Sequence, residues 1–173
     1  MAAAQVLRPE AGDYADYYAM YVEKVPDGDI LATLENQAAD AGFLRGLGPE
    51  AGDHRYEAGK WSIKEVVGHI TDTERVFSYR QLRIARNDGA ALNGFDQDDW
   101  MTHSGFAERS LDDLLDEWEQ TRANSLCLLR TFTPEMIERS GMADGKRVSL
   151  RMITWLLAGH AQHHFEVLRE RYL

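Results

Sequence analysis

The stretch WSIKEVVGHITDTERVFSYRQLRIAR, residues 61–86, predicts a long amphipathic helix. Ser62 followed by Glu65 is a capping-box pattern, in which each side chain binds a backbone N–H that the first helical turn leaves unpaired. Apolar residues then recur at helical spacing to about Arg86. His69 lies on this helix, at one edge of the face that we expect to be buried.

Three further segments show the same helical periodicity, so the chain is expected to form four long helices. They cover residues from about Asp29 to Leu47, from Ser110 to Phe132, and from Ser149 nearly to the C-terminus. Four amphipathic helices with few strand signals predict an all-α fold, an up-down four-helix bundle. The length fits one domain over residues 1–173, with residues 1–28 as an N-terminal extension packed on or near the bundle.

The connections between these helices differ in length and composition. A long loop, NDGAALNGFDQDDWMTHSGFAERS, joins the second helix to the third, and loops of this length often bind ligands. Thr133 and Pro134 predict a short turn of helix, with threonine as N-cap and proline in the first helical position. The glycine-rich GMADGKRVS that follows is read as a small hairpin.

Charge and cysteine content exclude several classes of function. The 19 Lys+Arg against 29 Asp+Glu give a net charge of -10, and no basic cluster offsets it. Nucleic-acid and anionic-membrane binding depend on clustered cations, so we expect neither and predict a small-molecule partner. Cys127 is the single cysteine, which rules out an internal disulfide and a cysteine-based zinc knuckle. No leader or membrane span is evident, which predicts a cytoplasmic protein.

The stretch AGHAQHHFEV, residues 158–167, places three of the six histidines within the last helix. Because each residue advances by about 100° on an α-helix, His160 points at the centre of the apolar face. His164 lies about 40° to one side of it and His163 about 60° to the other. Imidazoles are therefore concentrated where the core of the bundle is expected.

Three interpretations of these histidines compete. Hydrogen-bonded core histidines are the ordinary one, but buried imidazoles need polar partners and the neighbours are mostly aliphatic. Acid–base catalysis without a metal needs a partner, yet Glu166 points away and no serine or cysteine is near. A metal site is the third, since histidines at positions i and i+4 can share one ion.

A metal held by two histidines of one helix needs a further ligand from elsewhere. His54 and His103 lie in predicted loops, whereas His69 lies on a helix that could face the last one. The His-Glu-x-x-His motif of zinc proteases, the Glu-x-x-His motif of di-iron bundles and a glycine-rich phosphate loop are all absent. The spacing alone leaves open whether His163 or His164 joins His160.

The chain resembles the DinB-like superfamily, the DinB/YfiT-like metalloenzymes. The resemblance rests on residues 61–86, on GFDQDDW at 94–100 and on GHAQHHFEVLRERY at 159–172. It implies an up–down four-helix bundle with a divalent metal, nickel or zinc, held by three histidines. Carried onto this chain, the ligands are His69, His160 and His164, while His163 is their neighbour. A homodimer is also what the resemblance implies.

The resemblance implies an enzyme that acts on a small molecule by hydrolysis or by transfer of a low-molecular-weight thiol, which would be a cosubstrate. The alternative is a non-catalytic stress-response or interaction protein with a structural or degenerate site. No catalytic residue can be named from the sequence. Asp72 and a carboxylate of the 96–99 loop are candidates to orient a ligand histidine, although solvated surface acids are the default expectation.

Two further pairs of residues are candidates to line the site or to contact its substrate. Arg80 and Arg83 lie near the same line of the helix as His69 and are candidates to bind an anionic substrate. In so acidic a chain, however, an ion pair is the expected role of each. Phe95 and Trp100 of the long loop are candidates for the wall of a cleft, with simple packing onto the bundle as the alternative.

Overall fold

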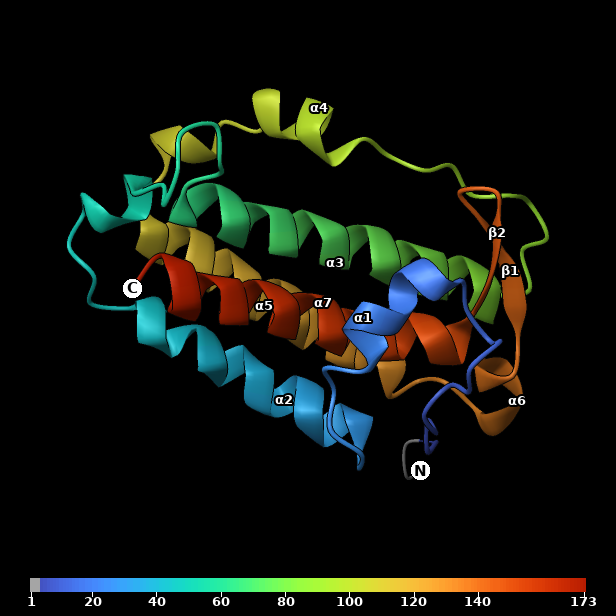
Figure 1. Ribbon diagram of the computed structural model, residues 1–173. Helices are drawn as coiled ribbons and strands as arrows, with labels where there is room; N and C mark the ends of the chain where they lie inside the picture. The colour runs from blue at the N-terminus through green and yellow to red at the C-terminus, as the bar shows by residue number, and fades with distance from the viewer. Residues whose placement is uncertain (1–3) are drawn as a thin grey trace.

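The computed structural model describes residues 4–173 and contains the four expected long helices. They are α2 (Ile30–Asp40), α3 (Ile63–Ala85), α5 (Leu111–Leu129) and α7 (Leu150–Arg171). Together they form the four-helix body seen in Figure 1. The helical periodicity of the sequence therefore predicted all four. The first is shorter than expected, because residues Ala41–Leu44 continue it as a 3-10 turn, η2, and the third ends at Leu129 instead of Phe132.

Side-chain caps explain why the four helices begin where they do. Asp29, Ser62, Ser110 and Ser149 are the N-cap residues, and each accepts a hydrogen bond from a backbone N–H of the first turn. At Ser62 the capping box is complete, because the Glu65 carboxylate also accepts from the Ser62 N–H, at 2.6 Å.

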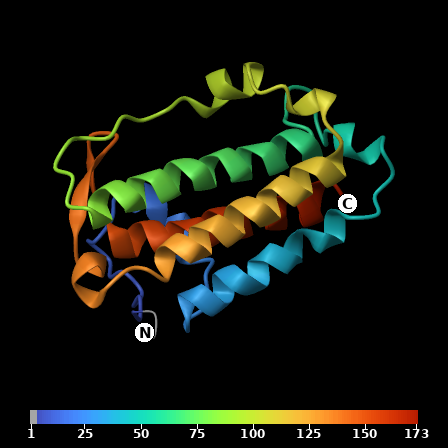
Figure 2. The same ribbon diagram turned by 180° about the vertical axis from the view of Figure 1, so that it is seen from behind.

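The helices do not alternate in direction, so the up-down order was wrong. In Figures 1 and 2, α3 and α5 run the same way along the bundle, and α2 and α7 run the opposite way. Contacts between α3 and α5 confirm the parallel pairing: Glu74 binds Arg122, and one turn later Ser78 meets Ser125 at 2.8 Å. Both α2 and α3 pack against α5 and α7, so these two consecutive helices occupy opposite corners.

The long connection after α3 is the physical reason for this topology. It returns along the whole length of α3, so α5 starts at the same end of the bundle as α3 does (Figure 1). The connection carries a short helix that the sequence did not predict, α4 (Gln97–Thr102), and a 3-10 turn, η4 (Phe106–Glu108).

A small hairpin precedes α7, so the fold is mostly helical rather than strictly all-α. Strands β1 (Ser140–Ala143) and β2 (Lys146–Ser149) pair antiparallel around Asp144 and Gly145, which both have positive φ. The hairpin confirms the reading of GMADGKRVS and follows the short helix α6 (Pro134–Ile137). Leu92 of the long connection joins the hairpin, because its N–H donates to the Met142 carbonyl at 2.9 Å.

The segment before α2 crosses α7 near its middle (Figure 1). It contains the 3-10 turn η1 (Asp16–Tyr18) and helix α1 (Ala19–Val22). A glycine makes the close crossing possible: a Cβ at Gly159 of α7 would stand 2.1 Å from the Tyr21 carbonyl oxygen.

A last 3-10 turn, η3 (Ala51–Asp53), precedes α3. None of the helices within residues 4–173 is long and apolar enough to span a bilayer.

A buried arginine joins all four long helices at the middle of the bundle. The guanidinium of Arg122 on α5 donates to both carboxylate oxygens of Glu74 on α3, at 2.8 to 3.0 Å. It also donates to the Gln37 side chain of α2 at 3.0 Å and reaches the Leu157 carbonyl of α7 at 3.5 Å. Arg122 is completely buried, so these groups of the protein, and not water, have to stabilise its charge.

Replacing Arg122 by methionine should therefore destabilise the protein by about 3–5 kcal/mol, because Glu74 would keep a buried charge without a partner. The free energy of unfolding in urea measures this. Arg130→Met is the matched control on the same helix, since Arg130 pairs with Glu35 in solvent. That pair should contribute no more than about 1 kcal/mol. Equal losses in the two variants would contradict a structural role for the Arg122 network.

Candidate metal centre

Three histidines from two helices meet inside the bundle. His69 comes from α3, and His160 and His164 come from successive turns of α7. The antiparallel packing of α3 and α7 brings His69 opposite the pair, so that the Nε2 atoms of His69 and His160 are 3.1 Å apart. The Nε2 atoms of His164 and His160 are 3.2 Å apart. The structure thus brings together the three residues that the resemblance implies as ligands.

The spacing of these nitrogens fits a single ion. Two nitrogen ligands at 2.0–2.1 Å from a tetrahedral metal lie about 3.3 Å from each other. The nitrogen separations at His160 are close to this value, and one ligand atom from each of the three histidines falls within 4.8 Å of the others. Imidazole nitrogens suit zinc, nickel, copper and iron, so the donor set is compatible with a divalent transition metal.

Burial keeps these imidazoles neutral, which is the form that binds metals. Desolvation lowers the pKa of His69 to about 4. It also lowers the pKa values of His160 and His164 well below the usual range, and the mutual repulsion of the protonated rings adds to this effect. Each ring of the cluster therefore keeps one unprotonated nitrogen at neutral pH, and that nitrogen can bind a metal.

Aromatic side chains hold the histidine rings in place. The Trp61 ring lies against His69, with 4.8 Å between centroids, and the Tyr21 ring lies 5.6 Å from that of His160. Phe77, two turns beyond His69 on α3, contacts the other side of His160 at 6.1 Å. These contacts fix the orientation of the imidazoles without offering them a competing charge.

His163 lies outside the group. Its ring meets the edge of the Tyr21 ring at 5.5 Å, and its side chain is only partly buried. Burial and the neighbouring Lys24 lower its pKa, but its nitrogens are not among the converging ligand atoms. The cluster of converging nitrogens therefore contains His164 and not His163, whereas the helical spacing had left both open.

A pocket of about 240 Å³ opens directly onto His69 and His160. Its wall comes from four parts of the chain: α3, α7, the N-terminal segment, and the region of the long connection and hairpin. The residues beside the two histidines are Tyr17, Tyr18, Tyr21, Thr73, Phe77, Arg80, Gly94, Phe95, Gln97, Asp144 and Leu156. A wider hollow of about 550 Å³ reaches His164 and His163 from the other side.

The sequence predicted part of this wall. Phe95 lines the pocket as expected, and Trp100 stacks against Phe95 with 4.6 Å between ring centroids. The three tyrosines of the N-terminal segment were missed, because no local pattern in residues 1–28 indicates that this segment crosses α7. Thr73 and Asp144 were missed for the same reason, since only the tertiary fold brings them to the pocket.

The residues proposed to orient a ligand have other partners. Asp72 pairs with Arg75 at 3.2 Å, and burial raises its pKa although the arginine opposes the shift. In the 96–99 loop, Asp96 caps α4 by accepting from the N–H groups of Asp98 and Asp99. Within residues 4–173, neither Asp72 nor Asp96 makes a hydrogen bond to a histidine of the cluster.

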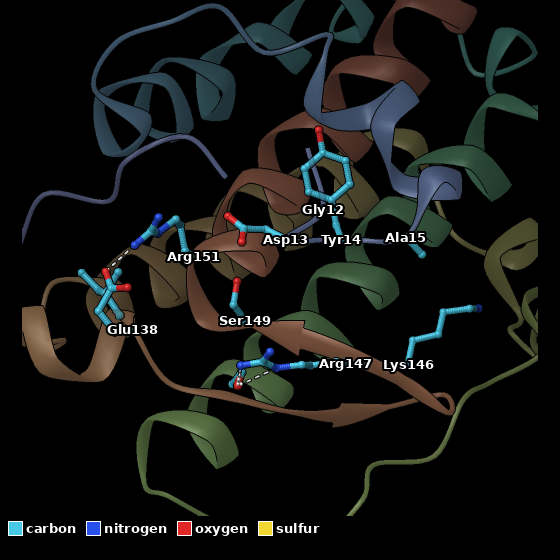
Figure 3. A pocket seen from close by; sticks show the side chains of 11 residues that line it. Gly12, Asp13, Tyr14, Ala15, Glu138, Lys146, Arg147, Ser149 and Arg151 are labelled. Atoms are coloured by element: carbon cyan, nitrogen blue, oxygen red, sulfur yellow. Dashed lines mark hydrogen bonds and ion pairs between the residues drawn. The ribbon is translucent and has the colours of Figure 1, made fainter. Parts of the chain in front are cut away.

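A larger pocket lies at the hairpin end of the bundle, away from the histidines (Figure 3). It holds about 520 Å³ between the N-terminal segment, the hairpin and the start of α7. Its charged side chains largely satisfy one another: Arg151 pairs with Glu138, and Arg147 donates to Ser140 at 3.1 Å. None of its lining residues is a histidine or a cysteine, so size alone does not mark the candidate site.

The metal-free protein should lose stability as the pH falls through the histidine range. His69 has a pKa of about 4 in the folded protein and about 6.5 when unfolded, so acid favours the unfolded chain. His69 alone should reduce the free energy of unfolding by about 2 kcal/mol between about pH 7.5 and pH 5. Urea denaturation of chelator-treated protein measures this, with His69→Gln as the variant that should lose part of the dependence. A pH-independent free energy would contradict the neutral buried state.

Comparisons with known proteins agree with the fold. The family model described as the DinB superfamily matches residues 32–168. Among solved structures, YfiT from Bacillus subtilis, described as a probable metal-dependent hydrolase with an unusual four-helix bundle topology, aligns with a TM-score of 0.70. The two share 16% identity over 94% of this chain and 93% of that one. A search of the curated proteins finds no match. The match over residues 32–168 and the shared fold show that the chain belongs to the DinB superfamily.

Proposed function

We propose that this protein is a divalent-metal-dependent enzyme that acts on a small molecule, with His69, His160 and His164 as the metal ligands. The observation that carries the proposal is the convergence of one ring nitrogen from each of three neutral histidines, two of which line a pocket. Nickel and zinc are the ions we expect. An ion held by three imidazoles keeps further positions open, where it can polarise an oxygen or stabilise a thiolate of the substrate.

The residues of this chain would supply three things to such a reaction. The imidazoles stay neutral because they are buried, so no imidazolium has to lose its extra proton before the metal binds. Tyr21, Phe77 and Phe95 surround the ligand nitrogens with apolar surface, which strengthens electrostatic interactions inside the pocket. The pocket, with a volume of about 240 Å³, admits a metabolite-sized molecule and excludes a folded polymer.

Hydrolysis and transfer of a low-molecular-weight thiol are the two reactions to compare. The likeness to YfiT, described as a probable metal-dependent hydrolase, supports hydrolysis. The resemblance to the superfamily supports thiol transfer as well, with the thiol as a cosubstrate. The bound substrate would reach the histidines from the side of Tyr21 and Phe77, where the pocket opens onto His69 and His160.

Metal content after purification and reconstitution tests the ligand assignment. His69→Ala, His160→Ala and His164→Ala should each lose the metal, because each removes one of three coordinate bonds. The loss of affinity should exceed the roughly tenfold to hundredfold effect of removing an outer hydrogen-bond partner of a ligand. His163→Ala is the matched control and should keep about one ion per chain, as should the wild type. Metal retained by His160→Ala would overturn the site.

Activity is tested on the wild type loaded with nickel or with zinc. Small amides, esters and electrophiles with an added thiol form the substrate panel, and His163→Ala serves again as the control. Turnover should disappear on chelation, return when the ion is added back, and be absent in His160→Ala. A protein that binds the metal but turns over none of the panel would contradict the catalytic proposal while leaving the metal site intact.

A further inference from the structure

One of the two buried arginines among the described residues has no acidic partner. Arg122 is neutralised by Glu74, but Arg80, which is 6% exposed, has no carboxylate within 4.0 Å. The expectation of an ion pair at this position was therefore wrong, whereas Arg83 on the same helix does pair, with Asp88. The only hydrogen bond that Arg80 makes within residues 4–173 goes to the Asn93 carbonyl, at 3.1 Å.

This arrangement leaves most of the Arg80 donors unused. A guanidinium carries five N–H donors, and leaving a buried charge unpaired is costly. Burial lowers the Arg80 pKa, and Tyr18 and Asp144 offset this only in part. Asp144 itself pairs with Lys146, at 3.5 Å. Arg80 therefore remains charged and lacks an oxyanion to bind.

Arg80 lines the same pocket as the histidine cluster, on the same face of α3 as His69. Side chains on a helix lean toward its N-terminus, which directs Arg80 back toward His69. Phe77 lies between the two ends of the pocket: its ring centroid is 6.0 Å from the guanidinium carbon and 6.1 Å from the His160 ring. The guanidinium and the cluster are thus separated by about the span of one aromatic side chain.

A second polar group in the pocket also lacks a partner. The Thr73 hydroxyl, on a side chain that is 3% exposed, makes no hydrogen bond within the described chain. Threonine in a helix commonly bonds to the carbonyl four residues earlier, as Thr71 does with Val67 and Thr154 does with Leu150. Thr73 lines the pocket one turn beyond His69, and because its hydroxyl oxygen is itself buried, Arg80 remains the unpaired polar group that the pocket presents to a ligand.

We infer that the substrate of this site is a small organic oxyanion, whose carboxylate, sulfonate or phosphate is bound by Arg80 while its reacting group lies at the three histidines. Guanidinium groups bind such oxyanions through paired, charge-assisted hydrogen bonds. Phe77 and Tyr21 pack against the apolar part of the molecule. This inference rests on the proposed function, because it places the reacting group at the metal ligands.

The charge of the protein makes Arg80 necessary for such a substrate. A net charge of -10 repels anions at long range, so affinity must come from local contacts. Inside the pocket the guanidinium is shielded from water, which strengthens its attraction for an anion. A neutral molecule of the same shape gains nothing from it and leaves the charge unpaired.

Calorimetric titration of the metal-free protein with benzoate, benzenesulfonate and phenyl phosphate tests the inference, with benzyl alcohol as the neutral analogue. At least one oxyanion should bind more tightly than benzyl alcohol. Arg80→Met should weaken that binding by about tenfold or more, since hydrogen bonds to a charged group are lost. Arg80→Lys should keep part of the affinity, and Arg86→Met, an exposed arginine at the end of α3, should keep all of it.

The outcomes separate this inference from the proposed function. Equal binding of the oxyanion by wild type and a folded Arg80→Met, or no preference for any oxyanion over benzyl alcohol, overturns the inference. Thermal unfolding verifies that each variant is folded. If Arg80→Met does not fold, oxyanion binding by Arg80→Lys is compared with that of the wild type instead. Metal content is measured on the same variants. If the protein binds metal but does not prefer oxyanions, only the inferred substrate class is wrong. If it prefers oxyanions but binds no metal, only the proposed metal site is wrong.

Discussion

The buried ion pair between Arg122 and Glu74 is the constraint on which the arrangement of the bundle depends. Within residues 4–173 it is the one place where all four long helices share polar contacts, because the guanidinium also bonds to Gln37 and approaches the carbonyl of Leu157. A buried charge tolerates little sliding of its partners, so these bonds fix the register of α3 against α7. His160 follows Leu157 by less than one turn, and His69 and His160 therefore face each other at a fixed height in the bundle.

The histidine cluster lies next to this network, but its burial lowers the free energy of unfolding of the metal-free protein instead of raising it. Three imidazoles that are buried without charge and without carboxylate partners lower the stability of the metal-free chain below about pH 6.5. Apolar side chains at these positions would pack without that cost. The unfavourable burial of His69, His160 and His164 has a physical rationale if a metal compensates it, since ions that bind only the folded state stabilise it.

The sequence determined the helices better than their arrangement. N-cap residues such as Ser62 and Ser110 and the helical period are local signals, and they predicted closely where each of the four helices begins. The direction of α5 is not a local property, because it depends on the path of the connection after α3. The sequence shows that this connection is long enough to return along α3, but it does not show that the connection does so. The pairing of His160 with His164 was visible as i, i+4 spacing, but the approach of His69 and the position of His163 outside the cluster needed either the resemblance or the packing. The homodimer stays a prediction.

The returning connection also explains why a pocket exists over the histidines. In an alternating bundle a short turn would follow α3 and leave this face to solvent or to a neighbouring helix. Here the chain runs back across α3, places Phe95 against the opening, and is held at Leu92 by the hairpin that carries Asp144. The N-terminal segment covers the other side with Tyr21, which approaches closely because residue 159 is glycine. The parallel pairing of α3 and α5 thus requires a long connection between them, and this connection also forms part of the wall of the pocket. The topology and the pocket are therefore consequences of the same segment.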